Sequence, residues 1–324
     1  MKLFRPALAA LLALSLSSCA LFRGSPHADQ PAAAPPPAAV VPAPAVAPPA
    51  TVAASPRPAL WKISDEDTTI WLFGTIHVLP PDLQWRSPAI DAATAAADRL
   101  VIEVVIDKAN PQALAGELLN LGTASGLPPF LDRVPADRRA ALQRMIGRSG
   151  APPVLFDSLK TWAGAFMLVG ATLRDLGMTD SDSGAENVLQ ERFRAAARPI
   201  EGLETVREQL GFFDTLPEEA QRAFLMSMAE NPEDVRREFA AMLAAWTAGD
   251  EAAIAATFDD DLELSATLRQ VLLHDRNARW TDWLIRRMQQ PGKVFVAVGA
   301  GHLVGPNSVR AMLEARGVRI ERVQ

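Results

Sequence analysis

Two copies of the motif Gly-x-x-His lie near opposite ends of the sequence, and each follows a run of apolar residues. The copies are Gly74–His77 and Gly299–His302, and they contain two of the four histidines in the chain. Glycine lets the backbone turn away from a strand end, and the side chain three residues later then projects over that edge. Because imidazole binds metal ions and exchanges protons near neutral pH, two such strands lying close together predict an active site.

Two glutamates are candidates to complete this site. Glu103 interrupts the apolar run of residues 100–106, where a carboxylate without a partner is costly; the alternative is a strand-end residue that faces solvent or a structural arginine. Glu204 ends a short predicted strand, directly before Thr205 and Glu208, which have the spacing of a helix capping box. Its alternative is an ordinary carboxylate at a helix start, which the helix dipole favours.

Two histidines with one or two glutamates are sufficient to bind a divalent metal ion. We therefore expect His77, His302, Glu103 and Glu204 to be ligands of Zn²⁺, Mn²⁺ or Co²⁺, with nitrogen-rich ligation favouring Zn²⁺ and carboxylates favouring Mn²⁺. Water on such an ion loses a proton near neutral pH, and a glutamate that is not a ligand can act as the base. One Gly-x-x-His motif is weak evidence, because a core histidine usually explains it; two matched copies are stronger.

A predicted helix before the second motif supplies two further candidates. Arg276 falls in line with an apolar stripe made by every fourth residue, namely Leu268, Leu272, Trp280 and Leu284. A guanidinium in that row requires a carboxylate or a substrate oxyanion, and Asn277 beside it adds donors and an acceptor. We therefore include Arg276 and Asn277, with Glu103 and Glu204, among the candidate catalytic residues. The alternative for Arg276 is a snorkelling side chain at the edge of the stripe.

The order of predicted elements indicates an α/β fold. Residues 60–63 and 68–73 read as a hairpin, and a helix from 88 to about 97 then leads to a strand over 100–106. This strand–helix–strand order implies a parallel pair with a right-handed crossover. The rest is a helical middle region over 111–197, a short strand to Glu204 and helices over 217–290, followed by a strand over 294–298, a helix over 308–316 and a last strand over 318–323.

The first 58 residues predict export and anchoring. Residues 1–19 have a positive start, an apolar stretch and Leu-Ser-Ser before Cys19, the only cysteine of the chain. This pattern resembles a bacterial lipobox, so we expect a lipid on Cys19 and a place on the periplasmic side of a bacterial membrane, specifically the outer membrane; the alternative is an ordinary signal peptide. Residues 20–58 read as a disordered tether rich in proline and alanine, with eleven prolines from Ser25 to Pro58.

Charge argues against a nucleic-acid partner. The formal net charge is −6, and removal of Lys2 and Arg5 with the signal peptide takes it from −6 to −8. The sequence has no basic patch that would indicate binding to nucleic acid. Residues 59–324 remain as one domain of a size that can bury a large core, and the sequence does not predict its oligomeric state.

The motifs occur in an order that resembles the TraB/GumN family, which includes the Tiki metalloproteases. The resemblance covers about residues 59–324 and rests on segments 73–77, 202–205 and 298–305, together with Glu103, Gln209, Arg276 and Asn277. It implies a mixed, largely parallel central sheet flanked by helices, as in the ChaN and erythromycin-esterase proteins, with the site at the strand ends. By position, it also implies that His77, Glu103, Glu204 and His302 form the site, supported by Arg276 and Asn277.

The expected function is a lipid-anchored, metal-dependent hydrolase that acts on peptides or proteins. Proteolysis is attributed to the animal Tiki proteins, and a fold analogy does not transfer a reaction. A second hypothesis is therefore a binding protein that captures a peptide signal or haem without turnover, and a third is a structural factor of the cell envelope. One departure from the family pattern is Glu186, which stands where relatives usually have aspartate, and its role stays open.

Overall fold

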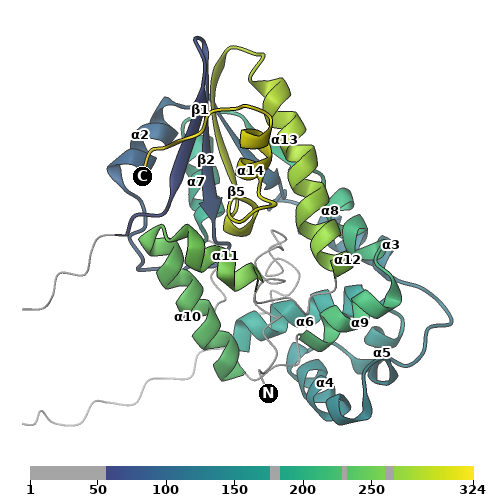
Figure 1. Cartoon of the computed structure of the whole chain (residues 1–324). Helices are drawn as coiled ribbons and strands as arrows, with labels where there is room; N and C mark the ends of the chain where they lie inside the picture. The colour runs from purple at the N-terminus through teal and green to yellow at the C-terminus, as the bar shows by residue number, and fades with distance from the viewer. Residues whose placement is uncertain (1–55, 176–182, 228–231, 260–265) are drawn as a thin grey trace, which may run out of the picture.

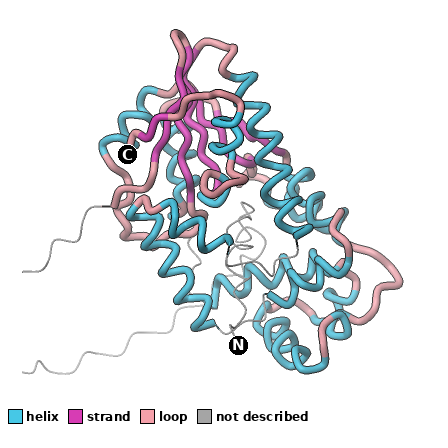
Figure 2. Tube along the Cα trace, viewed as in Figure 1, coloured by secondary structure: helices cyan, strands magenta, loops and turns pink. Residues whose placement is uncertain are grey.

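The computed structural model describes residues 56–175, 183–227, 232–259 and 266–324. The expected signal peptide, Cys19 and nearly all of the expected tether lie outside these residues. The described part contains a six-stranded sheet in the order β4-β3-β5-β2-β1-β6, with helices on both faces and a further group of helices below it (Figures 1 and 2). The expected α/β fold with a mixed, largely parallel sheet is therefore confirmed.

The predicted hairpin at the start of the folded region is confirmed. Strands β1 (Leu60–Ser64) and β2 (Thr68–Thr75) pair in antiparallel orientation. The Asp65 carboxylate accepts hydrogen bonds from the backbone N–H groups of Asp67 and Thr68, which closes the turn. The turn thereby fixes the register that carries the first motif to the end of β2.

Four strands run parallel, but their order differs from the expected one. Strand β5 (Gly292–Gly299) lies between β2 and β3 (Arg99–Val104), and β4 (Ile200–Glu204) follows β3. The expected neighbours β2 and β3 are thus parallel but not paired. The reason is that β5 is apolar on both faces, a pattern that favours a central position in a parallel sheet, so it takes the place between them.

Helices cover both faces of the sheet (Figure 1). Helices α2 (Pro88–Ala96) and α7 (Ala185–Ala195) pack on the face that presents Phe73, Phe295 and Ala297. Helices α13 (Asp275–Arg287) and α14 (Val309–Ala315) pack on the opposite face. Adjacent residues of one strand therefore contribute to different cores, as strand geometry requires.

A second core joins most of the expected helical middle region, residues 111–197, to two later helices, whereas α7 of that region packs on the sheet. This core is formed by α3 (Pro111–Gly122), η2 (Phe130–Arg133), α4 (Ala136–Ser149), α5 (Pro153–Asp157), α6 (Thr161–Asp175), α8 (Val206–Asp214) and α9 (Glu218–Ser227). Trp162, Phe166, Phe213 and Phe224 pack in this core. Helix α8 begins after Thr205 with the predicted capping box to Glu208, so Glu204 stands at the carboxyl end of β4 as expected.

Two helices and a short connection complete the described part. Helices α10 (Pro232–Ala248) and α11 (Glu251–Asp259) meet at Gly249, which has a φ of 66°. Helix α12 (Ala266–Arg269) continues through a π-helical turn, η4 (Gln270–His274), into α13. Among the helices of the described residues, none has the length and apolar character needed to cross a bilayer.

The last predicted strand is shorter than expected. Strand β6 contains only Glu321 and Arg322, which pair with β1. Gly317 has a φ of 80°, and the backbone N–H of Val318 bonds to the carbonyl of Leu313. The residues directly after α14 therefore close the helix, which leaves only the end of the segment to extend the sheet.

Candidate metal centre

The two Gly-x-x-His motifs meet at one edge of the sheet. Because β2 and β5 are parallel neighbours with Thr75 opposite Gly299, both motifs leave from the same end of the sheet. A Cβ atom on Gly74 would lie 3.0 Å from the Cα of Ala300, which belongs to the second motif. Such a contact is tighter than nearly all Cβ contacts, so glycine at this position favours the close packing of the two turns.

His77 contacts a carboxylate at the start of α7. Its Nδ1 lies 3.0 Å from Oε2 of Glu186, and the Thr75 hydroxyl donates to Oε1 of Glu186 at 2.8 Å. The backbone N–H of Ala185 also bonds to the carbonyl of Ile76, which ties the helix start to the first motif. Glu186 is buried, so α7 brings a carboxylate to the first histidine from one face of the sheet.

Glu103 is fully buried at the carboxyl end of β3. Its Oε1 accepts a hydrogen bond from the backbone N–H of Gly299 at 2.7 Å, and its Oε2 accepts one from Arg276 at 2.6 Å. Burial acts to raise the pKa of Glu103, but the positive charge of Arg276 and the hydrogen bond from the Gly299 backbone outweigh it and lower the pKa to about 2. Glu103 is therefore an ionised carboxylate in the interior, and its contact with Arg276 agrees with the alternative interpretation, in which it faces a structural arginine.

His77, Glu103 and Glu186 form a group that could hold a metal ion. Each offers one ligand atom, and these atoms lie within 4.8 Å of one another. Ligand bonds to Zn²⁺ are about 2.0–2.2 Å long, and tetrahedral geometry then places two ligand atoms about 3.3–3.6 Å apart. The most widely separated atoms of the group would therefore have to approach each other by about 1 Å to bind an ion in common.

Arg276 connects Glu103 to Glu204. Its Nε and Nη2 donate to the Glu204 carboxylate at 2.8–3.1 Å, and the indole N–H of Trp280 donates to the same carboxylate at 3.1 Å. Burial acts to lower the pKa of Arg276, but the two carboxylates raise it above its ordinary value. Glu204 is thus the counter-ion of a buried arginine, and Gln209 donates a further hydrogen bond to it at 3.1 Å.

His302 is fixed by partners on α13. Its Nδ1 lies 2.6 Å from Oδ1 of Asn277, whose amide nitrogen donates to the carbonyl of Asn307. Its Nε2 lies 3.3 Å from Nη1 of Arg276. Since a guanidinium only donates, Nε2 accepts and the proton is on Nδ1. Burial, followed by the charge of Arg276, lowers the pKa of His302 to about 3, so the ring is neutral.

The structure brings all six predicted residues to one end of the sheet but separates them into two groups. Glu103 belongs to both: it contacts Arg276, and it is a member of the group with His77. Nε2 of His302 lies 3.8 Å from Oε1 of Glu103, next to that group. Glu204 lies outside it, on the far side of Arg276. For the ligand set, the geometry therefore favours Glu186 over Glu204.

The sequence did not predict the contributions that three further residues make to the site. Glu186 was set apart only as a departure from a family pattern, although its position after Gly184 at a predicted helix start was a usable indication. Trp280 was expected to be a core residue; it is buried, but its indole also bonds Glu204 and its ring packs 4.4 Å from that of His302. Nothing in the sequence indicated that Thr75 would hold Glu186.

These features define an α/β protein with a buried histidine and carboxylate centre at the carboxyl end of its parallel strands. The model of the TraB/PrgY/gumN family matches residues 59–322, and the chain belongs to that family. The protein named Uncharacterized protein YbaP, from Escherichia coli K12, is 26% identical over 246 residues, covering 75% of this chain and 86% of the relative. The YbaP of Shigella flexneri matches to the same extent. No solved structure gives a significant match.

Proposed function

We propose that this protein is a metal-dependent hydrolase that acts on peptides, with His77, Glu103 and Glu186 as ligands of a divalent ion. The observation that carries the proposal is the convergence of these three side chains within 4.8 Å. Zn²⁺, Mn²⁺ and Co²⁺ all accept such a mixed nitrogen and oxygen set. A bound ion of this kind would supply a water molecule acidified enough to act as a nucleophile near neutral pH.

The two buried glutamates, Glu103 and Glu204, would have different roles in this proposal. Glu103 suits a ligand better than a base, because a pKa of about 2 leaves it a poor proton acceptor at neutral pH. Glu204 is occupied by Arg276 and Trp280 and therefore serves as a buried counter-ion. The formal charges of Glu103, Glu204, Arg276 and Arg279, which is paired with Glu204 at 3.4 Å, sum to zero, and Glu186 brings the sum to −1. This excess of negative charge favours a cation beside Glu103.

The two histidines would have different roles. His77 would bind the ion, and the carboxylate of Glu186, 3.0 Å from its Nδ1, would be a second ligand beside it. Nε2 of His302 is engaged by Arg276 and would have to release it to bind the same ion. His302 therefore stays a neighbour of the ion in this proposal, where it accepts a hydrogen bond from Arg276 and helps to hold the guanidinium against Glu103.

Metal content of purified full-length protein tests the proposal. After exposure to Zn²⁺, Mn²⁺ or Co²⁺ and removal of excess ion, we expect one equivalent in the wild type and little in His77→Ala. The variant His274→Ala is the matched control, because this histidine is half-buried on a different contact network, and it should keep the metal. Equal metal content in both variants, or none in the wild type, would contradict the proposal.

Turnover needs its own measurement. A peptide library digested from a bacterial proteome, incubated with metal-loaded protein, should yield new termini that are absent with Glu186→Gln and His77→Ala. If metal binds but no new termini arise, the chain is a metal-binding protein without this activity. Peptides that are retained intact would favour the second hypothesis, capture without turnover.

The proposed location is the periplasmic side of the bacterial outer membrane, held by a lipid on Cys19. It is supported by the apolar stretch and Leu-Ser-Ser before this cysteine and by the long proline-rich segment after it, which would give the domain reach. We expect the wild type to fractionate with membranes and to gain the mass of a lipid, and Cys19→Ser to do neither. An unmodified Cys19 in membrane-free fractions would contradict this location.

A further inference from the structure

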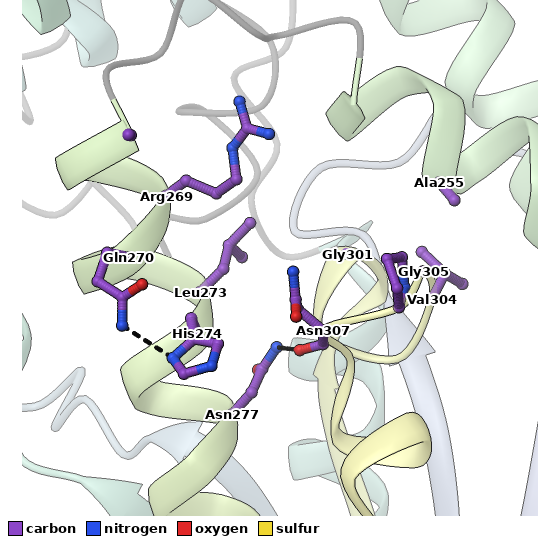
Figure 3. Close-up of a pocket in the computed structure, with 12 residues that line it drawn as sticks. Ala255, Arg269, Gln270, Leu273, His274, Asn277, Gly301, Val304, Gly305 and Asn307 are labelled. Atoms are coloured by element: carbon purple, nitrogen blue, oxygen red, sulfur yellow. Dashed lines mark hydrogen bonds between the residues drawn. The ribbon is translucent and has the colours of Figure 1, made fainter.

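A cavity of about 410 Å³ lies beside the second motif. It is bounded on one side by the segment from α12 through η4 to the start of α13, and on the other by the loop that follows β5 (Figure 3). Its lining residues are Ala255, Ala266, Arg269, Gln270, Leu273, His274, Asn277, Gly301, Val304, Gly305, Pro306 and Asn307. Its size falls in the range of pockets that hold small ligands, about 300–1,000 Å³.

The cavity and the candidate metal centre share a wall. Asn277 lines the cavity, and the same side chain holds Nδ1 of His302 at 2.6 Å. Its amide also donates to the carbonyl of Asn307, on the opposite side of the cavity, at 2.8 Å. Gly301, the residue before His302, lines the cavity as well. A molecule bound here would therefore be separated from His302 by a single side chain.

The walls of the cavity carry both hydrogen-bond donors and hydrogen-bond acceptors. Asn307 carries a carboxamide, with a carbonyl acceptor and an N–H₂ donor. The amide nitrogen of Gln270 already donates to Asp275 at 2.6 Å and lies 2.9 Å from Nδ1 of His274, so Gln270 offers its carbonyl oxygen. Figure 3 shows the Gln270 and Asn307 side chains on opposite walls. His274 adds an imidazole, and Arg269 adds a guanidinium. The twelve described lining residues include no carboxylate.

Apolar and backbone surface fills the space between these polar groups. Leu273, Val304 and Pro306 supply apolar area. Gly305 has a φ of 81°, a conformation that favours glycine, and a Cβ there would lie 3.9 Å from the Cβ of Ala255. Ala255 on α11 therefore lies close to this loop, so a larger side chain at position 255 would enter the cavity beside it.

From this lining we infer that the cavity is the subsite that binds a short extended segment of the peptide substrate. The inference rests on the proposed function and names the substrate contact for the same site. Every peptide unit carries one N–H donor and one C=O acceptor, which the carbonyl of Gln270 and the carboxamide of Asn307 can match. A wholly apolar ligand would bury these polar groups without partners at a cost.

Binding can be measured without catalysis. The probe is acetyl-Ala-Leu-Ala-amide, a capped tripeptide, titrated into methyl-labelled full-length protein in the presence of EDTA. We expect the methyl resonances of Leu273 and Val304 to shift in a saturable way. A matched pair of variants on α11 locates the site: Ala255→Phe fills the cavity and should weaken binding at least tenfold, whereas Ala256→Phe is on the exposed side of the helix and should change it less than twofold.

The outcomes separate this inference from the proposed function. Saturable shifts that Ala255→Phe removes support a peptide subsite even if the protein never binds a metal. Shifts that are absent, or equally weakened by both variants, overturn it even if the metal and turnover experiments succeed. Haemin is titrated in parallel, and a Soret band that appears in the wild type and is lost in Ala255→Phe would overturn the peptide assignment in favour of haem.

Discussion

The two histidines come from the same motif, yet the residues around them give them different properties. His77 is half-buried and held by the carboxylate of Glu186, so a positive charge on its ring or on an ion beside it is compensated. His302 is buried against the guanidinium of Arg276, where a second positive charge would be unfavourable. The motif sets where the rings lie, and the helices that reach them set which charge they can carry.

The environment of His302 predicts that the folded protein loses stability in mild acid. The pKa of His302 is about 3 in the folded chain and about 6.5 in the unfolded one. The unfolded state therefore binds more protons between these values, so the free energy of unfolding rises with pH and falls as pH decreases below about 6.5. The contribution of one such proton is up to about 2 kcal/mol between pH 6.5 and 5.

Chemical unfolding at a series of pH values checks this prediction. The wild type should lose stability from pH 7 to 5, and His302→Gln should lose less over the same interval, whatever its stability at pH 7. His274→Gln is the control and should follow the wild type. Below about pH 4.5, protonation of Glu103 adds a second loss with the same sign, because its pKa is also lowered on folding. Parallel pH profiles for wild type and His302→Gln would refute the assignment.

At the scale of single residues, the sequence predicted which residues belong to the site better than it predicted which residues they contact. Arg276 could be chosen because a cation interrupts an apolar stripe, and such a cation requires a carboxylate. The stripe could not indicate that it binds two carboxylates, Glu103 and Glu204, from different strands. Glu186 was underestimated for the same reason: its importance comes from contact with His77, 109 residues away along the chain, and nothing local reports that contact.

Among the elements, the turn after β2 is the most constrained. A Cβ on Gly74 would approach both Cα and Cβ of Ala300, at 3.0 and 3.2 Å, and the Gly74 carbonyl accepts a hydrogen bond from the indole of Trp246. Gly74→Ala must therefore push the two motif turns apart or move β2. We expect it to lower the free energy of unfolding by about 1–3 kcal/mol, as overpacking does, and to weaken metal binding.

Gly147 in α4 provides the matched control. A Cβ there meets no atom within 4 Å, and alanine is the better helix former, so Gly147→Ala should raise stability by up to about 1 kcal/mol. Denaturant midpoints and metal titrations of both variants give the comparison. If Gly74→Ala keeps wild-type stability and metal affinity, the close packing of the two turns is not what positions the histidines.

Individual helices and turns were predictable where side chains in the sequence mark their ends. The hairpin, the helix that begins after Ser87, and the capping box at Thr205 all have side chains that bond nearby backbone groups. The last strand was overestimated because Val318 looks like a strand residue but is used to close α14. Helix closure and strand extension compete for the same backbone, and apolar periodicity alone does not decide between them.

At the scale of the whole molecule, the order of the strands could not be predicted. Strand β5 comes from the end of the chain and enters between β2 and β3, which are close in sequence. This insertion is what joins the site, because β5 brings His302 between the strands that carry His77 and Glu103. The pattern of apolar residues indicates that β5 is buried on both faces, but many arrangements of the four parallel strands satisfy that condition.

The same arrangement makes metal binding a property of the folded chain. His77 follows β2, Glu103 lies on β3, and Glu186 lies on α7, so unfolding separates the three ligands. An ion that binds the folded state alone stabilises it by about 2.7 kcal/mol at a free concentration of 100 times Kd, which should raise Tm by about 5 °C. Thermal unfolding with Zn²⁺, Mn²⁺ or Co²⁺ against EDTA should show this rise in the wild type and in His274→Ala. His77→Ala should show none, and an equal rise in that variant would mean that the stabilising ion binds elsewhere.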